Sequence, residues 1–356
     1  MNTLKLAEWL LQRGYAITIF TVKNSRLYEE AKAIPVTLRE IDTPGKYFDF
    51  VNAKKIAAQL LSAGVEVLLV FDNRDISVVS IVKTFFYKNL RVIYQQHMQI
   101  GINKRDLFHT LRYSCIDRWI SPSRYLADEV SRKTRFPADK IRIIPLGVET
   151  ARFVNPAYSK QAARAKLNIS CNSLLIGIIG RISPKKGQYF LAQALPELQK
   201  KGVNAELLIF GSPTVNDTED IKNFAEIKNF VESHSLGDKV HFREYTRDVA
   251  LFYNSIDIFV LASQGETYGM VTIEAMLSGV PVIATNSVGS PEMLNNGEFG
   301  QLYSYEDFPD FCAKVLTVLN NKEKTGAMAE KAKSAAIEKF SHTRECDQIE
   351  ELLKEI

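Results

Sequence analysis

The amino-acid sequence predicts an α/β protein with two Rossmann-like halves, each built on a parallel β-sheet. Short runs of β-branched and aliphatic residues alternate with helical stretches along the whole chain, which is the pattern of βα units. A polar segment near residues 148–170 interrupts this alternation, and the pattern starts again after it. The length of 356 residues, with 46% hydrophobic and 24% charged residues, suits two ordinary globular domains.

The first half, residues 1–150, opens on a predicted helix over residues 3–14, and no strand-like run precedes this helix. Strands are predicted over residues 15–21, 34–41, 65–71, 90–96, 118–123 and 140–147. The first strand of a doubly wound sheet lies in its centre. We therefore expect a gap in the middle of this sheet, and a further strand ahead of residue 1 in the complete chain.

The second half, residues 151–340, resumes the alternation after the polar segment. Strands are predicted over residues 174–181, 204–211, 239–245, 256–263 and 281–285. The chain then ends on a predicted helix over residues 341–356 with no strand after it. This last helix is therefore free to pack into an apolar groove elsewhere in the protein.

Several classes of protein are disfavoured by the composition. The four cysteines are far apart in the sequence, which predicts reduced thiols and neither a metal site nor a disulfide framework. They are Cys115, Cys171, Cys312 and Cys346. The longest apolar runs are strand-sized, well below the roughly 20 residues that cross a bilayer. Lys5 and Glu8 lie inside the N-terminal helix, so we expect no signal peptide and a cytoplasmic location.

Charge is distributed unevenly between the two halves. Residues 1–150 carry 23 Lys and Arg against 15 Asp and Glu, whereas the remainder carries 22 against 26. A basic first half indicates an acidic partner or an anionic membrane surface, and a solvated basic face without a partner is the alternative. The basic residues are dispersed and form no recognisable binding motif, so we expect no nucleic-acid partner.

The stretch GETYGMVTIEAMLSGVPV, residues 265–282, predicts an anion site at the start of a helix. Gly265 and Gly269 interrupt any longer helix, so the helix is expected to begin near Met270. The backbone N–H groups of Gly269, Met270 and Val271 are then unpaired donors at the positive end of a helix dipole. Such an end binds phosphate groups, which here indicates a diphosphate.

Two glutamates lie on either side of this helix start. Glu266 is expected in the loop before the helix and Glu274 within its first turns. A carboxylate beside a diphosphate is repelled unless it binds hydroxyl groups, so we interpret Glu274 as a ligand of a ribose diol and Glu266 as a ligand of a second sugar. Two solvated carboxylates on one surface helix are the alternative.

A basic loop opens the second half. In GIIGRISPKKGQYFLAQAL a predicted strand ends at Gly180, Arg181 and Lys186 follow, and Gly187 starts a helix. Two cations beside an anion-sized gap are suited to neutralise a diphosphate leaving group. Basic loops between strands and helices are common, so this loop alone is weak evidence for a diphosphate site. The prediction depends on its combination with the glutamate pair in the same half of the chain.

The segments GRISPKKG and ETYGMVTIEAMLSGVPVIAT resemble the signature segments of the retaining glycosyltransferases of family 4, which have the GT-B fold. The resemblance extends over nearly the whole chain, through RWISPSRYLADEV, IRIIPLGVE, AELLIFG, IDIFVLAS and FSHTRECDQIEELL. It implies two Rossmann-like domains facing a cleft, with the last helix packing back onto the first domain. The C-terminal domain is then expected to bind a nucleotide sugar and the N-terminal domain an acceptor.

The resemblance also implies roles for particular residues. Arg181 and Lys186 are expected on the diphosphate, Glu274 on the ribose and Glu266 on the hydroxyls of the sugar. His97, in YQQHMQIG, falls where the family has a histidine near the transferred sugar. The implied catalytic residues are Arg181, Lys186, Glu266 and His97, and the implied donor-binding residues are Glu274, Gly269, Met270, Val271, Gly180 and Tyr245, the last through its main chain.

Three features depart from the family pattern. The glycine-rich loop after the first strand is absent together with that strand. Thr267 and Tyr268 stand where members usually have Gly-Phe, a change that can alter sugar selection. Gly289-Ser290 stands where a glycine pair is usual, which is tolerable if Ser290 still starts its helix.

The expected reaction is transfer of a hexosyl-type sugar, with retained anomeric configuration, from a UDP- or GDP-type donor to a glycan, lipid-linked or small-molecule acceptor. Arg181, Lys186 and the helix start supply positive charge for the leaving group, so neither a metal nor another cofactor is expected. We interpret DNRD at Asp72 as a turn after a strand. No carboxylate nucleophile is recognisable, so front-face attack by the acceptor is the hypothesis.

Other functions are compatible with the same cleft. An epimerase or phosphorylase of the GT-B type would keep the donor site but release free nucleotide or phosphate products. An exported two-domain sugar-binding protein would also have paired α/β halves. It binds no diphosphate or ribose, so Arg181, Lys186 and Glu274 count against this class. An inactive nucleotide-sugar-binding paralogue is favoured if residue 1 is the true start of the protein.

Overall fold

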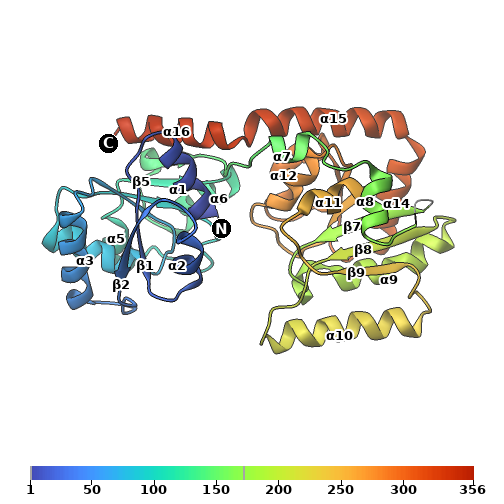
Figure 1. Ribbon diagram of the computed structural model, residues 1–356, viewed down its shortest axis with the longest axis horizontal. Helices are drawn as coiled ribbons and strands as arrows, with labels where there is room; N and C mark the ends of the chain where they lie inside the picture. Colours follow the sequence, from blue (N-terminus) through green and yellow to red (C-terminus); the bar gives the residue numbers. More distant parts are fainter. Residues whose placement is uncertain (1, 171–172) are drawn as a thin grey trace. The chain divides into compact units, whose positions relative to one another are not determined.

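The computed structural model describes residues 2–170 and 173–356, which form two compact units (Figure 1). Unit 1 contains residues up to Gly147 together with His342–Ile356, and unit 2 contains Val148–Ser341. The sequence placed the corresponding boundaries near residues 150 and 341. Cys171 lies outside the described residues, and Cys115, Cys312 and Cys346 are buried free thiols.

The described residues of unit 1 form two separate parallel sheets. The strands are β1 Thr18–Val22, β2 Thr37–Ile41, β3 Val67–Val70, β4 Arg91–Gln95, β5 Arg118–Ser121 and β6 Ile141–Ile143. The helices are α1 Asn2–Gln12, α2 Arg26–Ala31, α3 Phe50–Ser62, α4 Ile76–Ile81, η1 Val82–Phe86, α5 Leu107–Tyr113, α6 Arg124–Lys133, η2 Ala138–Lys140 and α16 His342–Lys354. The larger sheet has the order β3-β4-β5-β6, and β1 pairs with β2.

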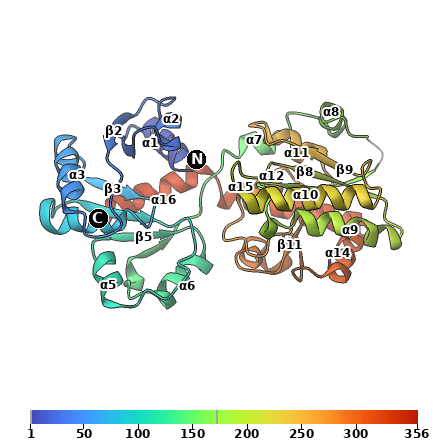
Figure 2. The same ribbon diagram turned by 90° about the horizontal axis from the view of Figure 1, so that it is seen from below.

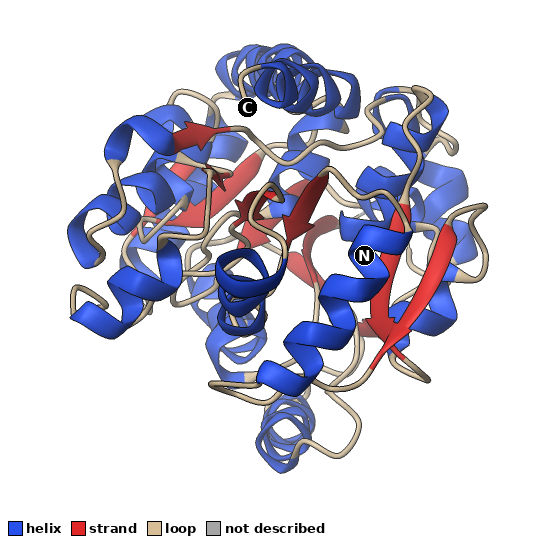
Figure 3. Ribbon diagram, turned by 90° about the vertical axis from the view of Figure 1, so that its left-hand side faces the viewer, coloured by secondary structure: helices blue, strands red, loops and turns tan. Residues whose placement is uncertain are grey.

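The division of this sheet is the gap that the sequence predicted. In the described part of the chain, β1 pairs only with β2, and β3 pairs only with β4. Figure 3 shows the strands in red. The open edge of β3 is reflected in the burial of its side chains. Val67, Leu68 and Leu69 of β3 are only half-buried, whereas Ile93 of β4, which has a strand on both sides, is fully buried.

The C-terminal helix α16 packs against the N-terminal helix α1. Apolar residues of both helices share one core with β4 and β5. The guanidinium of Arg13 binds the carboxylates of Asp347 at 2.7 Å and Glu350 at 3.0 Å. The rings of Trp9 and His342 lie 5.0 Å apart. The amphipathic pattern of the last helix is therefore explained by burial of its apolar face in unit 1.

A buried carboxylate lies where α16 begins. Oε2 of Glu345 accepts a hydrogen bond from the backbone N–H of Gly147 at 2.7 Å, and Oε1 accepts one from the side-chain amide of Gln95 at 3.1 Å. Burial raises the pKa of Glu345 to about 7, although both hydrogen bonds favour the charged form. A side chain at Gly147 would not fit, because its Cβ would lie 2.5 Å from the Cα of His342.

Glu345→Gln is expected to remove a pH dependence from the stability of unit 1. The folded pKa of Glu345 is raised, so its stabilising contribution is complete below the unfolded pKa near 4.5 and is lost as the pH rises through about 7. The neutral amide has no such loss. The free energy of unfolding of the variant, relative to wild type, should therefore rise by about 2 kcal/mol between about pH 5 and about pH 8.

Tryptophan fluorescence during urea unfolding measures this effect, because Trp9 and Trp119 are the two tryptophans of the sequence and both lie in unit 1. Glu351→Gln, at an exposed position of the same helix, is the control and should leave the pH dependence of wild type in place. Identical pH profiles for wild type and Glu345→Gln would contradict the assignment.

Unit 2 is built on one parallel sheet, whose order in residues 173–341 is β12-β11-β10-β7-β8-β9. The strands are β7 Leu174–Ile179, β8 Ala205–Phe210, β9 Val240–Arg243, β10 Ile258–Leu261, β11 Val282–Thr285 and β12 Gln301–Tyr303. The helices are α7 Ala151–Val154, α8 Lys160–Lys166, η3 Pro184–Lys186, α9 Gln188–Lys200, α10 Thr218–Ser233, α11 Val249–Ser255, α12 Met270–Leu277, α13 Ser290–Met293, η4 Asn295–Gly297, α14 Phe308–Asn320 and α15 Lys322–Lys339. Helices α9, α10 and α14 cover one face of this sheet (Figure 2).

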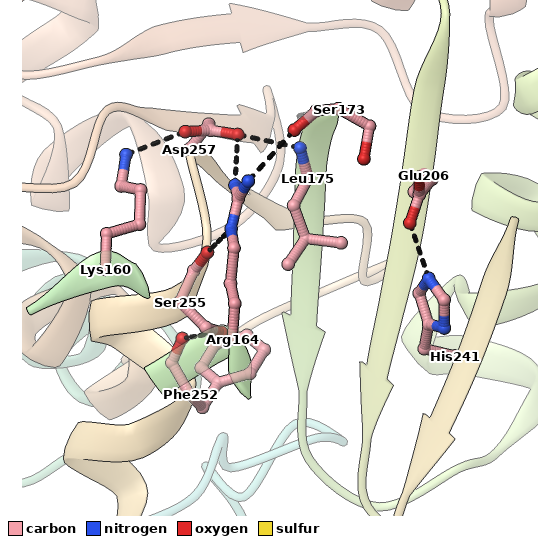
Figure 4. Close-up of polar contacts among 9 residues, drawn as sticks. All are labelled: Lys160, Arg164, Ser173, Leu175, Glu206, His241, Phe252, Ser255 and Asp257. Carbon is pink, nitrogen blue, oxygen red and sulfur yellow. Dashed lines mark hydrogen bonds and ion pairs between the residues drawn. The ribbon is translucent and has the colours of Figure 1, made fainter. Parts of the chain in front are cut away.

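A buried polar cluster joins helix α8 to the starts of β7 and β10 (Figure 4). The guanidinium of Arg164 donates to Oδ2 of Asp257 at 2.6 Å and to the backbone carbonyl oxygens of Ser255 and Ser173. The same Oδ2 accepts the backbone N–H of Leu175 at 2.8 Å. Burial alone would raise the pKa of Asp257, but the Leu175 amide, Lys160 and Arg164 together lower it. The cluster therefore fixes the ends of the two strands that lie opposite the candidate site.

Within the described residues, no helix is long and apolar enough to cross a membrane.

Candidate functional site

The candidate site lies at the point where the strand order of unit 2 reverses. Strand β7 pairs with β8 on one side and with β10 on the other, so the helices that follow β7 and β10 leave the sheet on opposite sides. Parallel α/β sheets bind ligands beyond the carboxyl ends of such strands. The loop after β7 holds Arg181 and Lys186, and the loop after β10 holds Glu266. The topology therefore brings the predicted residues to one edge of the sheet.

The loop after β7 approaches the end of β10 very closely. Gly187 starts helix α9 with a φ of 81°, which a side chain rarely adopts. A Cβ at Gly187 would lie 2.3 Å from the carbonyl oxygen of Ala262. The backbone N–H of Gln264 donates to the carbonyl oxygen of Lys185 at 2.9 Å. Glycine is therefore required at position 187, and the two loops form one backbone framework.

Lys186 and Glu266 form an ion pair across this framework. Nζ of Lys186 lies 2.8 Å from Oε2 of Glu266, and both side chains are partly buried. The carbonyl oxygen of Glu266 accepts the backbone N–H of Gly289 at 3.0 Å. A Cβ at Gly289 would lie 2.4 Å from the carbonyl oxygen of Thr267, so the glycine of the Gly289-Ser290 pair is the indispensable one. Ser290 starts helix α13, as the departure from the family pattern required.

Helix α12 begins at Met270, as predicted, and its first residues present unpaired backbone donors. Gly269 precedes it with a φ of 81°. Among the described residues, the N–H groups of Gly269, Met270 and Val271 have no hydrogen-bond partner. Glu266 lies in the loop before them. Its side chain is close to the helix start, since a Cβ at Gly269 would lie 3.3 Å from the Cγ of Glu266. These donors are available to an anion beside the Lys186–Glu266 pair.

Glu274 is held one turn further along α12 by a buried tyrosine. The hydroxyl of Tyr253 lies 2.9 Å from Oε2 of Glu274 and 3.0 Å from the carbonyl oxygen of Val271. Burial, followed by the charge of Glu274, raises the pKa of Tyr253 well above its ordinary value, so this hydroxyl stays protonated. Tyr245, the tyrosine that was predicted at the donor site, follows β9 and is 52% exposed. Nothing in the sequence marked Tyr253, which lies in the ordinary apolar helix α11.

Arg181 takes a different direction from Lys186. Its side chain is 58% exposed, and its Nε lies 3.8 Å from the buried Oδ2 of Asp220. Its carbonyl oxygen accepts the side-chain amide of Gln188 at 2.9 Å. Arg181 is thus at the rim of the loop after β7, with a long exposed side chain that can reach an anion. Asp220, which the sequence analysis missed, also accepts the N–H of Thr214.

His97 belongs to unit 1, whereas the other predicted site residues belong to unit 2. It follows β4 and stacks obliquely against Phe71, with ring centroids 5.8 Å apart. Burial lowers the pKa of His97, so its ring is neutral at neutral pH. Its buried Nε2 has no hydrogen-bond partner within the described residues. The turn predicted at Asp72 is present after β3, where Oδ1 of Asp72 accepts the N–H of Arg74 at 2.8 Å.

The described residues contain no group of three or more His, Cys, Asp and Glu side chains that could hold a metal ion. The charges of the candidate site are the cations Arg181 and Lys186 and the carboxylates of Glu266 and Glu274. Together with the donors of α12, this set suits a ligand that has an anionic part and a part rich in hydroxyl groups.

Two protein families match the chain, one over each half. Residues 3–152 match the family described as Glycosyltransferase Family 4, and residues 159–335 match Glycosyl transferases group 1. Two curated relatives illustrate the range. Spore coat protein SA of Bacillus subtilis is 26% identical over 66% of this chain and 65% of its own length. Alpha-monoglucosyldiacylglycerol synthase of Streptococcus pneumoniae is 29% identical over 57% of this chain and 45% of its own length.

The chain thus matches 65% of the length of the first relative and 45% of the length of the second. Solved structures cover the chain more completely. A glycosyltransferase from Rickettsia africae has a TM-score of 0.88 at 20% identity, and covers 99% of this chain and 93% of its own. Anabaena HepE, solved with UDP and glucose, has a TM-score of 0.81 at 16% identity, covering 100% and 95%. The fold is therefore GT-B, and the chain belongs to the family 4 glycosyltransferases.

Proposed function

We propose that this protein transfers a sugar from a nucleoside diphosphate sugar, of the UDP or GDP type, to an acceptor, with retention of anomeric configuration. The observation that carries the proposal is the arrangement around α12. The unpaired N–H groups of Gly269, Met270 and Val271 lie beside the Lys186–Glu266 ion pair, and Glu274 follows one turn later. A diphosphate between two sugars presents the matching groups in the same order.

The roles follow from the charges. The bond between the anomeric carbon and the diphosphate oxygen breaks, and its electron pair stays on the diphosphate. Lys186, Arg181 and the start of α12 stabilise this increasing negative charge. The acceptor hydroxyl forms a bond to the anomeric carbon from the same face and passes its proton to the departing phosphate oxygen. The products are the glycosylated acceptor and a nucleoside diphosphate, and no metal ion is assigned a role.

The two carboxylates are proposed to bind hydroxyl groups. Glu274, oriented by Tyr253, accepts from the ribose diol. Glu266 is paired with Lys186 in the structure. When Lys186 binds the diphosphate, Glu266 becomes free to accept from the sugar. His97 is proposed to approach the transferred sugar from unit 1, where its neutral ring can accept or donate a hydrogen bond.

The acceptor is proposed to be a glycan or a lipid-linked molecule, with the enzyme peripheral at the inner face of a membrane. The positive charge of residues 1–150 supports an acidic or membrane-bound acceptor. One relative is named as a synthase of alpha-monoglucosyldiacylglycerol, a glycolipid.

Glu274→Ala is expected to abolish stabilisation by the donor. A ligand present at 100 times its dissociation constant stabilises the folded state by about 2.7 kcal/mol. The wild type should therefore show a higher melting temperature with one of a panel of UDP- and GDP-sugars, and the variant should show no shift. Tyr253 retains its hydrogen bond to Val271, so the variant is expected to fold.

Glu323→Ala, at an exposed position of α15 in the same unit, is the matched control and should keep the full shift. Equal shifts for wild type and Glu274→Ala would refute the role of Glu274, and no shift with any donor would refute the proposed activity. Product analysis separates the alternatives, since an epimerase or phosphorylase forms no glycosylated acceptor.

A further inference from the structure

Unit 1 exposes a continuous set of large apolar side chains, here called the aromatic surface. Its members come from the loop before α3 and the first residue of that helix, from η1, and from α5. They are Tyr47, Phe48, Phe50, Phe85, Leu107 and Phe108. The rings of Tyr47 and Phe48 lie 5.3 and 5.9 Å from that of Phe108, and Phe50 lies 5.4 Å from Phe85. These contacts join three separate segments of the chain into one surface.

The exposure of these side chains is unusually high for their size. Phe48 is 71% exposed, Phe85 60% and Leu107 69%. One exposed apolar residue is ordinary, but a contiguous group marks a surface that binds something. Phe48 also has a φ of 53°, a backbone conformation that bulky residues rarely adopt. Neither burial nor backbone preference therefore accounts for an aromatic residue at this position.

Helix α3, which begins at Phe50, exposes both apolar and basic side chains. On α3, exposed Val51 is followed one turn later by exposed Lys54 and Lys55, and by exposed Leu61 after two more turns. Lys46 lies over the ring of Tyr47, 5.3 Å from its centroid. Long basic side chains beside aromatic rings are typical of surfaces that lie at the boundary between water and lipid.

The surroundings of the aromatic surface are strongly basic. Residues 42–62, 82–91 and 96–113, which carry it, contain nine Lys and Arg against three Asp. Each of these aspartates is occupied locally. Asp42 pairs with Lys55 at 2.7 Å, whereas Asp49 and Asp106 accept backbone N–H groups at the starts of α3 and α5.

Of these nine cations, Lys55 pairs with Asp42, Lys83 pairs with Asp117 and Arg112 is buried. Four further cations are exposed and have no carboxylate partner in the described residues, namely Lys46, Lys54, Lys88 and Arg91. Net positive charge is therefore available to an anionic partner.

We infer that the aromatic surface docks unit 1 onto an anionic lipid bilayer. The aromatic and leucine side chains enter the boundary between headgroups and acyl chains, and the surrounding Lys and Arg bind the acidic headgroups. A second copy of this chain is a poorer occupant, because it would bring two basic surfaces together. The inference concerns the membrane partner of the proposed enzyme, but its test needs neither donor nor acceptor.

Co-sedimentation with lipid vesicles tests the inference. The wild type should sediment with vesicles of equimolar phosphatidylcholine and phosphatidylglycerol, and much less with phosphatidylcholine alone. Phe48→Ser and Phe85→Ser should each lower the partition coefficient about tenfold, because each removes an aromatic side chain that would leave water for the bilayer. Lys54→Glu should lower it about fivefold or more with the anionic vesicles only.

Val215→Ser is the matched control, because Val215 is 83% exposed but belongs to unit 2, and its partition coefficient should equal that of wild type. Melting curves establish that every variant is folded. Equal binding of wild type and Phe48→Ser/Phe85→Ser, or equal binding to neutral and anionic vesicles, would overturn the inference. So would a wild-type dimer in sedimentation equilibrium that Phe48→Ser converts to monomer without any vesicle binding. Failure here leaves donor binding, measured separately, unaffected.

Discussion

Lys186→Ala is expected to lower kcat by about 10²–10³-fold while the protein still folds and binds the donor. A preorganised positive group at a developing negative charge is worth about this much when it acts mainly in the transition state. Lys186 is held at the end of η3 by the backbone framework around Gly187, and its ammonium is already directed at Glu266 in the free protein. Its removal also leaves the carboxylate of Glu266 uncompensated beside the diphosphate, which acts in the same direction.

Steady-state kinetics with the donor found by the melting panel measures this effect. Lys185→Ala is the matched control, because Lys185 is the preceding residue, is exposed and contributes its backbone carbonyl rather than its ammonium to the framework. It should retain nearly full activity. A change in KM alone for Lys186→Ala would show that the residue contributes equally to ground-state and transition-state binding, and would contradict its role at the leaving group.

Much of the fold could be predicted because parallel strands in α/β proteins are short apolar runs with turn signals at both ends. Each run predicted as a strand overlaps an observed strand, and only β1 extends beyond its run, by the one residue Val22. One observed strand, β12 Gln301–Tyr303, was not predicted from the sequence. It has three residues at the edge of the sheet, and of these only Tyr303 is fully buried, too little to form a hydrophobic run.

The candidate site was predictable where backbone chemistry dominates. Glycines around Glu266 and ahead of Met270 indicated the start of α12, and the structure places that start as expected. The contact between Lys186 and Glu266 was not predictable, because the residues are 80 positions apart and only the pairing of β7 with β10 brings their loops together. Tyr253 was missed for the same reason, since a buried tyrosine on an apolar helix shows its partner only in three dimensions.

Arg164→Ala is expected to lower the free energy of unfolding of unit 2 by about 3 kcal/mol, because its buried guanidinium is the common donor of a partly buried carboxylate and two carbonyl oxygens. Lys160→Ala is the matched control. Lys160 binds Oδ1 of the same Asp257 at 2.7 Å, but its side chain is 52% exposed, so its loss should cost less than about 1 kcal/mol. Urea unfolding followed by circular dichroism measures both variants.

The pH dependence of the same cluster gives an independent check. The pKa of Asp257 is lowered in the folded protein, so its contribution is present above its unfolded pKa near 3.8 and is lost as the pH falls through its lower folded value. Arg164→Ala should weaken this acid dependence, because it removes one of the charges that lower the pKa. A variant as stable as wild type, with the same acid dependence, would show that Arg164 does not hold β7 and β10 together. The site depends on the opposite ends of these two strands, so its geometry is expected to require this anchor.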